Sequence, residues 1–246
     1  MDFFSRQNEQ KTYFMPNQST HEFYKAYVIN VKDFLIAENE IRRTINRALK
    51  ERNQLSINVQ TKLYGLLYST YSEANFMKMI LTPYGFEQVF VEEILKQESI
   101  QQKWSKCIEL GFLKFSKNSK GSEIPNKMLE LKKMIQKFIV DPSVIRNKIA
   151  HGQLTIAMNS KNTNLNPELT NQLQNLDFIK IYRWFQINKQ LCEIIEDLIE
   201  SPDKAHHNFY YSKYQKLEEF IKKTNSWTIE SKMLTKSMKK KIPIKK

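Results

Sequence analysis

Apolar residues recur every three or four positions along most of this chain, which is the spacing that predicts amphipathic α-helices. The first stripe predicts a helix from about Thr20, capped by Ser19 or by Thr20 itself, and a polar break over 51–56 ends it. A second helix is predicted over 57–81. Glycine occurs only 5 times, so tight β-hairpin turns have few candidate positions. We therefore predict an all-α fold.

Proline and polar segments divide the rest of the chain. Asp141-Pro142 has the form of an N-cap followed by proline at the first helical position, and it predicts a new helix that runs into His151-Gly152. The segment 153–175 is rich in Asn, Thr and Gln, which predicts a long loop with 154–158 as a candidate strand. The other predicted elements are one or two short helices over 86–115, a polar loop over 116–122, and helices over 127–140, 176–200 and 203–224.

The chain is long enough for one helical domain with smaller additions. It has 246 residues, of which 41% are hydrophobic, and this amount supports a single core. We divide it into an N-terminal extension over 1–19, a helical domain over 20–202, a C-terminal helix over 203–225 and a basic tail over 226–246. The tail is rich in lysine and has little apolar support, so we predict that it is flexible.

Positive charge is the most uneven property of the composition. Lysine and arginine total 39 against 26 acidic residues, which gives a formal charge of +13 and favours an anionic partner such as RNA. Membrane surfaces and acidic proteins also fit this charge. Most of the cations are lysines, which suit general attraction to phosphate better than bidentate recognition of bases. A codon bias toward lysine explains the same excess equally well.

Several function classes lack their sequence signatures. The chain has no P-loop, no paired-cysteine zinc motif and no nucleophile-elbow pentapeptide, so we expect no metal and no cofactor. Cys107 and Cys192 stand in separate apolar stretches, which predicts buried free thiols. His206 and His207 have no neighbouring ligand set, so we predict that both are surface residues. No signal-peptide pattern or membrane-length apolar run is present, so we expect a cytoplasmic protein with no membrane partner.

The segment from Ile145 to Gly152 holds the motif that points most directly to chemistry. Arg146, Asn147 and His151 form the pattern R-N-x-x-x-H, with glycine directly after the histidine. This motif and the helices around it, over about 20–202, resemble the HEPN superfamily. The resemblance implies a bundle of about four helices, a homodimer, and a composite active-site cleft in which both copies of the motif cut RNA without metal.

The residue types of the motif suit RNA cleavage through the 2′-hydroxyl. An imidazole exchanges its proton near neutral pH, so His151 is a candidate general base for that hydroxyl. A guanidinium binds phosphoryl oxygens in bidentate fashion, so Arg146 would hold the scissile phosphate and stabilise the transition state. The expected products carry a 2′,3′-cyclic phosphate and a 5′-hydroxyl. The competing interpretation is that both are ordinary basic residues at a helix C-terminus.

Helix geometry separates the members of the motif. Asn147 and His151 are four positions apart and share a helix face, whereas Arg146 and His151 point about 140° away from each other. We infer that Asn147 orients the imidazole or the helix end. Arg146 then either reaches round where Gly152 lets the helix finish or serves the site of the partner protomer.

Other charged residues are secondary candidates for the site. The resemblance implies an acidic residue on an earlier helix that faces the motif, and Glu73 is the best-placed candidate, with Arg146 as its partner. A solvated glutamate on the outer face of its helix is the competing interpretation. Lys148, Lys132 and Lys133 are candidate RNA-binding residues.

Together these features predict a metal-independent endoribonuclease of the HEPN type that acts on RNA as a homodimer. Family analogy suggests a toxin or an antiphage-defence effector, with an antitoxin or another defence-system protein as a further partner. The alternative is a non-catalytic HEPN module that binds RNA, nucleotide or protein. A third hypothesis is a structural helical interaction protein whose charge only keeps it in solution.

Overall fold

Every regular element that the structure describes is a helix, as the hydrophobic pattern predicts. The computed structural model describes residues 20–115 and 123–231. The predicted cap Ser19, the extension over 1–19, the loop over 116–122 and the tail beyond 231 lie outside these residues. In chain order the elements are α1 (Thr20–Lys50), α2 (Gln54–Ile80), α3 (Gln88–Leu95), α4 (Ile100–Phe115), α5 (Glu123–Ile135), the π-helical turn η1 (Gln136–Val140), α6 (Asp141–Ala150), α7 (Pro167–Gln174), α8 (Phe178–Glu200), the π-helical turn η2 (Pro202–His206) and α9 (His207–Thr224).

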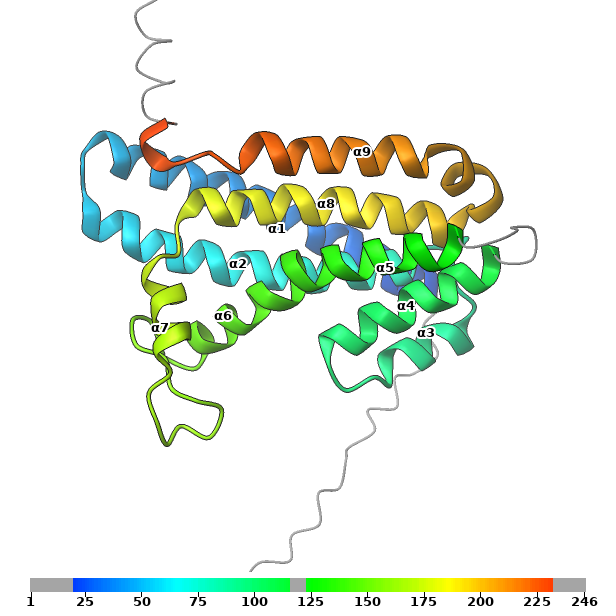
Figure 1. Cartoon of the computed structure of the whole chain (residues 1–246), viewed down its shortest axis with the longest axis horizontal. Helices are drawn as coiled ribbons and strands as arrows, with labels where there is room; N and C mark the ends of the chain where they lie inside the picture. Colours follow the sequence, from blue (N-terminus) through cyan, green and yellow to red (C-terminus); the bar gives the residue numbers. More distant parts are fainter. Residues whose placement is uncertain (1–19, 116–122, 232–246) are drawn as a thin grey trace, which may run out of the picture.

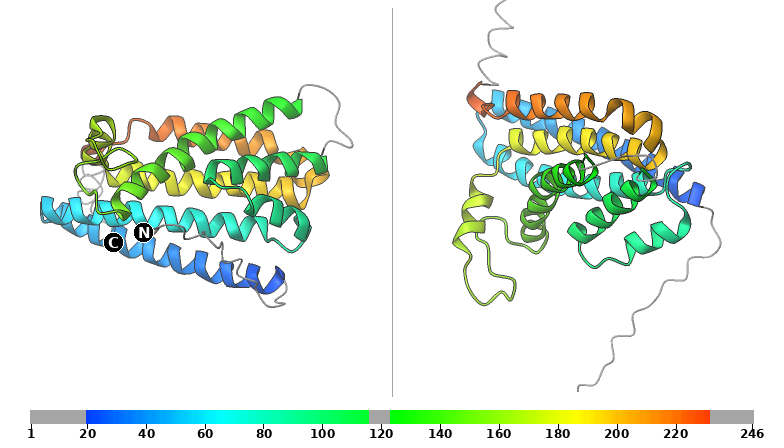
Figure 2. Two further views of the ribbon diagram at one scale, coloured as in Figure 1. Left: turned by 90° about the horizontal axis from the view of Figure 1, so that it is seen from below. Right: turned by 45° about the vertical axis from the view of Figure 1, so that its right-hand side comes forward.

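Four long helices form the body of the described molecule. α1 and α2 run antiparallel, and α8 lies along α2 with α9 on its outer side (Figure 1). The helix made of α5, η1 and α6 crosses α2 and α8 obliquely, while α3 and α4 lie at one end of the bundle and α7 at the other (Figure 2). None of the described helices has both the length and the apolar character that a membrane span needs.

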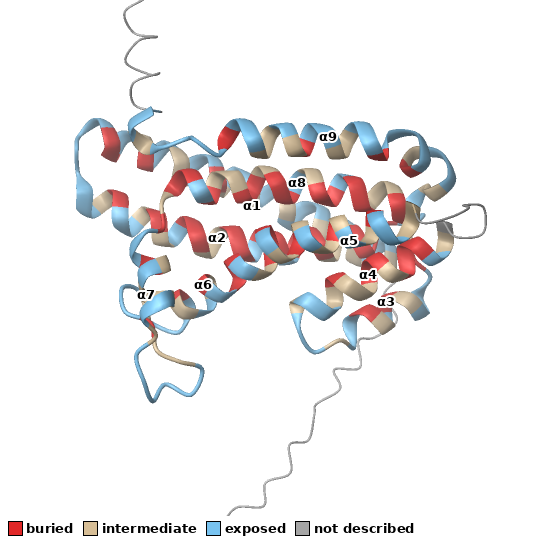
Figure 3. Ribbon diagram, in the orientation of Figure 1, coloured by how far each residue is buried: buried red, intermediate tan, exposed pale blue. Residues whose placement is uncertain are grey.

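The core lies between α2 and α8, which carry long rows of buried positions (Figure 3). Aromatic rings from the two helices interlock there. The Phe185 ring lies 5.2 Å from the Tyr64 ring and 4.9 Å from the Tyr71 ring between centroids, and Tyr68 lies 5.6 Å from Trp184. Such rings bury large apolar areas and pack with preferred angles, so they fix how α2 lies on α8.

A buried chain of polar side chains sets the register of the same two helices. The Asn75 amide donates to Asn188 Oδ1 at 3.1 Å, and the Asn188 amide donates to Ser72 Oγ at 2.9 Å. A buried polar group that loses its partner costs about 1–3 kcal/mol. A shift of α8 along α2 would break both bonds, so the arrangement of the two helices is specific.

Asp141 does not begin a new helix, contrary to the prediction. α5, η1 and α6 are continuous, and Asp141 has helical angles (φ −57°, ψ −46°) with its N–H bonded to Gln136 O. Pro142 has no N–H to give to the carbonyl of Phe138, four residues earlier. The buried hydroxyl of Tyr68 on α2 donates to that carbonyl at 2.6 Å. A tertiary contact therefore gives this carbonyl a donor in place of the N–H that proline lacks, and the helix continues.

The predicted long loop over 153–175 is wrong in its second half, because α7 lies within it. Asn166 caps this helix, since its side-chain oxygen accepts the N–H of Leu169 at 2.9 Å, and Pro167 occupies the first helical position. The helix is too short for a clear apolar period, so the hydrophobic pattern does not predict it. The candidate strand over 154–158 is also wrong, because its backbone forms only an isolated bridge between Met158 and Leu165.

His206 is buried, which corrects the prediction of a surface residue. Its ring lies between those of Phe112 and Tyr210, at 5.6 and 5.0 Å between centroids, and the residue is 1% exposed. Loss of water around the imidazole lowers the pKa of His206 to about 4. His207, which points in a different helical direction, is exposed as predicted.

Both cysteines are buried free thiols, as predicted. Burial raises the pKa of Cys107 and of Cys192, because the thiolate would have to form without water around it. Neither sulfur is therefore placed to act as a nucleophile.

Candidate functional site

The motif residues lie where α6 ends. His151 is the C-cap residue, and Gly152 follows it with a φ of +82°. The N–H of Gly152 bonds to Ile149 O at 3.1 Å, and the N–H of Gln153 bonds to Lys148 O at 2.8 Å. These two bonds form the Schellman motif, in which the residue after the cap takes a left-handed conformation that glycine adopts without strain. The left-handed conformation at the helix end thus explains why a glycine stands directly after His151.

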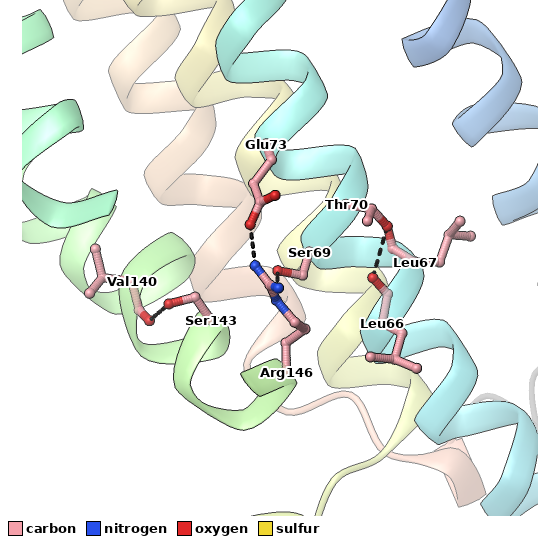
Figure 4. Close-up of polar contacts among 8 residues, drawn as sticks. All are labelled: Leu66, Leu67, Ser69, Thr70, Glu73, Val140, Ser143 and Arg146. Atoms are coloured by element: carbon pink, nitrogen blue, oxygen red, sulfur yellow. Dashed lines mark hydrogen bonds and ion pairs between the residues drawn. The ribbon is translucent and has the colours of Figure 1, made fainter. Parts of the chain in front are cut away.

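Arg146 points from α6 toward α2 (Figure 4). Its Nε donates to Ser69 Oγ at 2.9 Å, and one terminal nitrogen pairs with the carboxylate of Glu73. The side chains of Arg146 and Glu73 are 27% and 47% exposed, so the pair is open to water and contributes at most about 1 kcal/mol to stability. The contact therefore acts mainly to hold the guanidinium in one orientation.

Ser69 belongs to this site although the sequence did not identify it. Ser69 and Glu73 are four positions apart on α2, so they share a helix face and present two acceptors to one guanidinium. A serine inside a helix carries no functional signal by itself. Its spacing from Glu73 is the one sequence feature that points to it.

Asn147 and His151 are both exposed. They are one helical turn apart, and the N–H of His151 bonds to Asn147 O at 3.0 Å. Their side chains make no hydrogen bond within residues 20–115 and 123–231, and no hydrogen bond there joins Arg146 to His151. One copy of the chain therefore presents the imidazole of His151 and the amide of Asn147 at the helix end. The guanidinium of Arg146 is held toward α2, and among the described residues it makes no hydrogen bond to either group.

Lys148 holds the loop that follows the motif. Its Nζ donates to Met158 O at 2.6 Å and lies 3.4 Å from Asn159 O. Gln153 adds a second tie, because its side-chain oxygen accepts the N–H of Met158 at 2.8 Å. The ammonium group thus orders the loop beside His151, and its role as an RNA ligand stays a prediction.

Lys132 and Lys133 lie on α5, away from the other candidates. Lys132 Nζ pairs with Glu109 at 2.7 Å, and Lys133 is exposed. The helix rises roughly 20 Å between Lys133 and Arg146, at 1.5 Å per residue. Both lysines line a separate hollow of about 260 Å³ with Gln101. The structure does not bring them together with the motif.

Among the described residues, no group of three or more His, Cys, Asp or Glu side chains is arranged to hold a metal ion. Comparisons of this chain with protein-family models, with curated proteins and with solved structures found no match.

Proposed function

We propose that this chain is a metal-independent endoribonuclease of the HEPN type. One observation carries the proposal. Arg146 of α6 pairs with Glu73 of α2, and α6 ends at an exposed histidine, His151. The all-helical fold agrees with the architecture that the motif implies. By family analogy the enzyme acts as a toxin or an antiphage-defence effector.

In the proposed reaction His151 removes the proton of an RNA 2′-hydroxyl, and the oxygen attacks the adjacent phosphate. Arg146 has five N–H donors, of which two are engaged by Ser69 and Glu73, so the others remain for the phosphoryl oxygens. Glu73 is a positioning residue, since it acts by orienting this guanidinium. The products are a 2′,3′-cyclic phosphate and a 5′-hydroxyl.

The proposed active site draws on two copies of the chain. Asn147 and His151 lie at the helix end, whereas Arg146 faces α2 and, among the described residues of one copy, makes its hydrogen bonds to Ser69 and Glu73 rather than to His151. A two-fold axis repeats both groups on facing surfaces, so His151 of one protomer can meet Arg146 of its partner. The site is then complete only in the homodimer.

Cleavage of labelled RNA in EDTA tests the proposed activity. The wild-type protein should cut, and His151→Ala and Arg146→Ala should each lower the rate by about 100-fold or more, because each removes a group that acts in the transition state. Lys189→Ala, an exposed change on α8, is the control and should leave the rate unchanged. Undiminished cleavage by His151→Ala, or no cleavage by the wild type, would contradict the proposal.

Mixing the two inactive variants tests the composite site. A heterodimer of Arg146→Ala and His151→Ala has one site with both groups intact if each site takes its two groups from different protomers. Half of the dimers in an equal mixture are heterodimers, so activity should return to roughly a quarter of the wild-type value. If each site lies within one protomer, mixing restores nothing.

The second candidate is a non-catalytic HEPN module that binds RNA. The favouring observation is that two of the Arg146 donors are already engaged and that no hydrogen bond among the described residues of one copy joins Arg146 to His151. Such a module would bind labelled RNA with affinity that falls steeply as salt rises, yet leave the RNA intact. Binding without cleavage in the same assay distinguishes the two functions.

A further inference from the structure

A cavity of about 600 Å³ opens on another face of the motif helix. Its walls come from η1, α6, α7 and α8, and α6 contributes Asp141, Val144 and Ile145 but not Arg146. Small-molecule pockets in proteins measure about 300–1,000 Å³, so the volume suits a small organic ligand. The cavity is therefore separate from the proposed ribonuclease residues, although it shares their helix.

Three cationic side chains line this cavity: Lys137, Lys180 and Arg183. Within residues 20–115 and 123–231 none of them forms an ion pair. Lys137 Nζ lies 5.3 Å from the centroid of the Phe138 ring, and Lys180 Nζ lies 5.7 Å from that of Trp184. Aromatic faces attract these ammonium groups but do not neutralise them. A bound anion would neutralise their positive charge.

The hydrogen bonds that hold Arg183 in place all go to neutral groups. Its Nε donates to Thr224 Oγ1 at 2.9 Å, and one terminal nitrogen lies 3.4 Å from Ile221 O and 3.5 Å from Asn225 Oδ1. Partial burial lowers the pKa of Arg183, because desolvation disfavours the charged guanidinium and the nearby Asp177 carboxylate offsets this only in part. The guanidinium is thus oriented in advance, and its other terminal nitrogen makes no hydrogen bond within the described residues.

The carboxylates of the cavity do not cancel its positive charge. Asp141 accepts a hydrogen bond from the Gln136 amide at 2.7 Å, and Glu168 lies 3.5 Å from the Gln172 amide. Both are engaged by neutral partners rather than by the cations. With three cations against two carboxylates, the lining keeps a positive excess.

Part of the cavity wall is apolar, and this favours an organic anion over an inorganic one as the ligand. Val144, Leu169 and Trp184 contribute apolar surface to the lining. Burial of apolar ligand surface on such residues favours binding, because it removes that surface from water. An anion with a carbon body therefore uses the whole site, whereas a bare ion uses only its charged part.

We propose that this cavity binds a small organic phosphate, with the phosphate at Lys137, Lys180 and Arg183 and the carbon body on the apolar wall. A phosphate monoester carries nearly two negative charges at neutral pH and several acceptor oxygens, which matches three cations and an oriented guanidinium. The proposal does not rest on ribonuclease activity.

Isothermal titration of the full chain with inorganic phosphate, ribose 5-phosphate and adenosine 5′-monophosphate tests this site. At least one monoester should saturate it and bind more tightly than inorganic phosphate. The double variant Lys137→Gln/Lys180→Gln should weaken that binding by about tenfold or more, because each lost ammonium removes a charge-assisted contact. Both lysines are exposed, so the fold should persist, and a thermal unfolding scan verifies this.

The matched control is Lys189→Gln/Lys216→Gln, which removes the same charge from exposed positions of α8 and α9 outside the cavity. It should leave monoester affinity within about twofold of the wild type. Three outcomes overturn the proposal: no saturable monoester binding in the millimolar range, equal losses in both double variants, or binding at this cavity by an RNA oligonucleotide but by no monoester.

Discussion

The hydroxyl group of Tyr68 links α2 to the helix that carries Arg146. It donates a hydrogen bond to the Phe138 carbonyl, to which Pro142 cannot donate because it has no N–H. Burial raises the pKa of Tyr68, so the hydroxyl stays protonated. At the scale of the single residue, this bond and the Arg146–Glu73 pair are two of the polar contacts that join the motif helix to α2.

Tyr68→Phe should lower the free energy of unfolding by about 1–3 kcal/mol, because it leaves a buried carbonyl without its donor. Tyr71→Phe is the control, since the Tyr71 hydroxyl makes no hydrogen bond within the described residues, and it should cost less than about 0.5 kcal/mol. Urea denaturation measures both. Equal losses in the two variants would show that the Tyr68 bond does not support the helix.

The residues of the candidate site differ in how far the sequence predicts them. Arg146, Asn147 and His151 stand in one short motif, whereas Glu73 is a candidate because the family resemblance implies an acidic residue on an earlier helix. Ser69 has no such signal, because a serine hydroxyl gains a role only when a donor from another helix reaches it. Local spacing therefore identifies the candidate residues, and the fold identifies the groups that contact them.

At the scale of the element, the end of α6 depends on Gly152. Its φ of +82° lies in the left-handed region, and a Cβ added there would have no heavy atom within 4 Å. Any cost of a larger residue is therefore conformational rather than steric crowding by neighbours.

Gly152→Ala should lower the free energy of unfolding by about 1 kcal/mol, because alanine resists the left-handed conformation. Gly65→Ala is the matched control inside α2. Its Cβ would meet Leu176, Ile149 and Ile181 side chains at 3.6–3.8 Å, which is ordinary contact, so alanine should raise stability by up to about 1 kcal/mol. Thermal unfolding compares the two. Shifts of the same sign would contradict this account of the helix end.

At the scale of the whole molecule, His206 lies where α4, η2 and α9 meet. The ordinary pKa of histidine is 6.5, and burial lowers that of His206 to about 4. The unfolded chain therefore binds this proton more readily than the folded chain does between these two pKa values. The stability that the neutral ring contributes is complete above pH 6.5 and is lost as the pH falls toward 4.

Between pH 7 and pH 4 the wild type should lose about 3 kcal/mol more stability than His206→Gln, which has no proton to gain at this position. His207→Gln, at the exposed neighbour, should behave like the wild type. Urea denaturation across this range measures the difference. If wild type and His206→Gln lose stability in parallel, burial of the imidazole is not what couples the fold to pH.

The sequence by itself determined the all-α class, the approximate extents of the longer helices and the residues of the candidate motif. These depend on spacing within one or two helical turns, which a linear pattern displays directly. Only the tertiary structure decided that the helix passes through Asp141, that His206 is buried, and that Lys137 and Arg183 line one cavity. Each of these features depends on contacts between segments that are far apart in the sequence. Arg146 and Ser69, for example, are 77 positions apart. The spacing of apolar residues within one helix carries no information about such contacts.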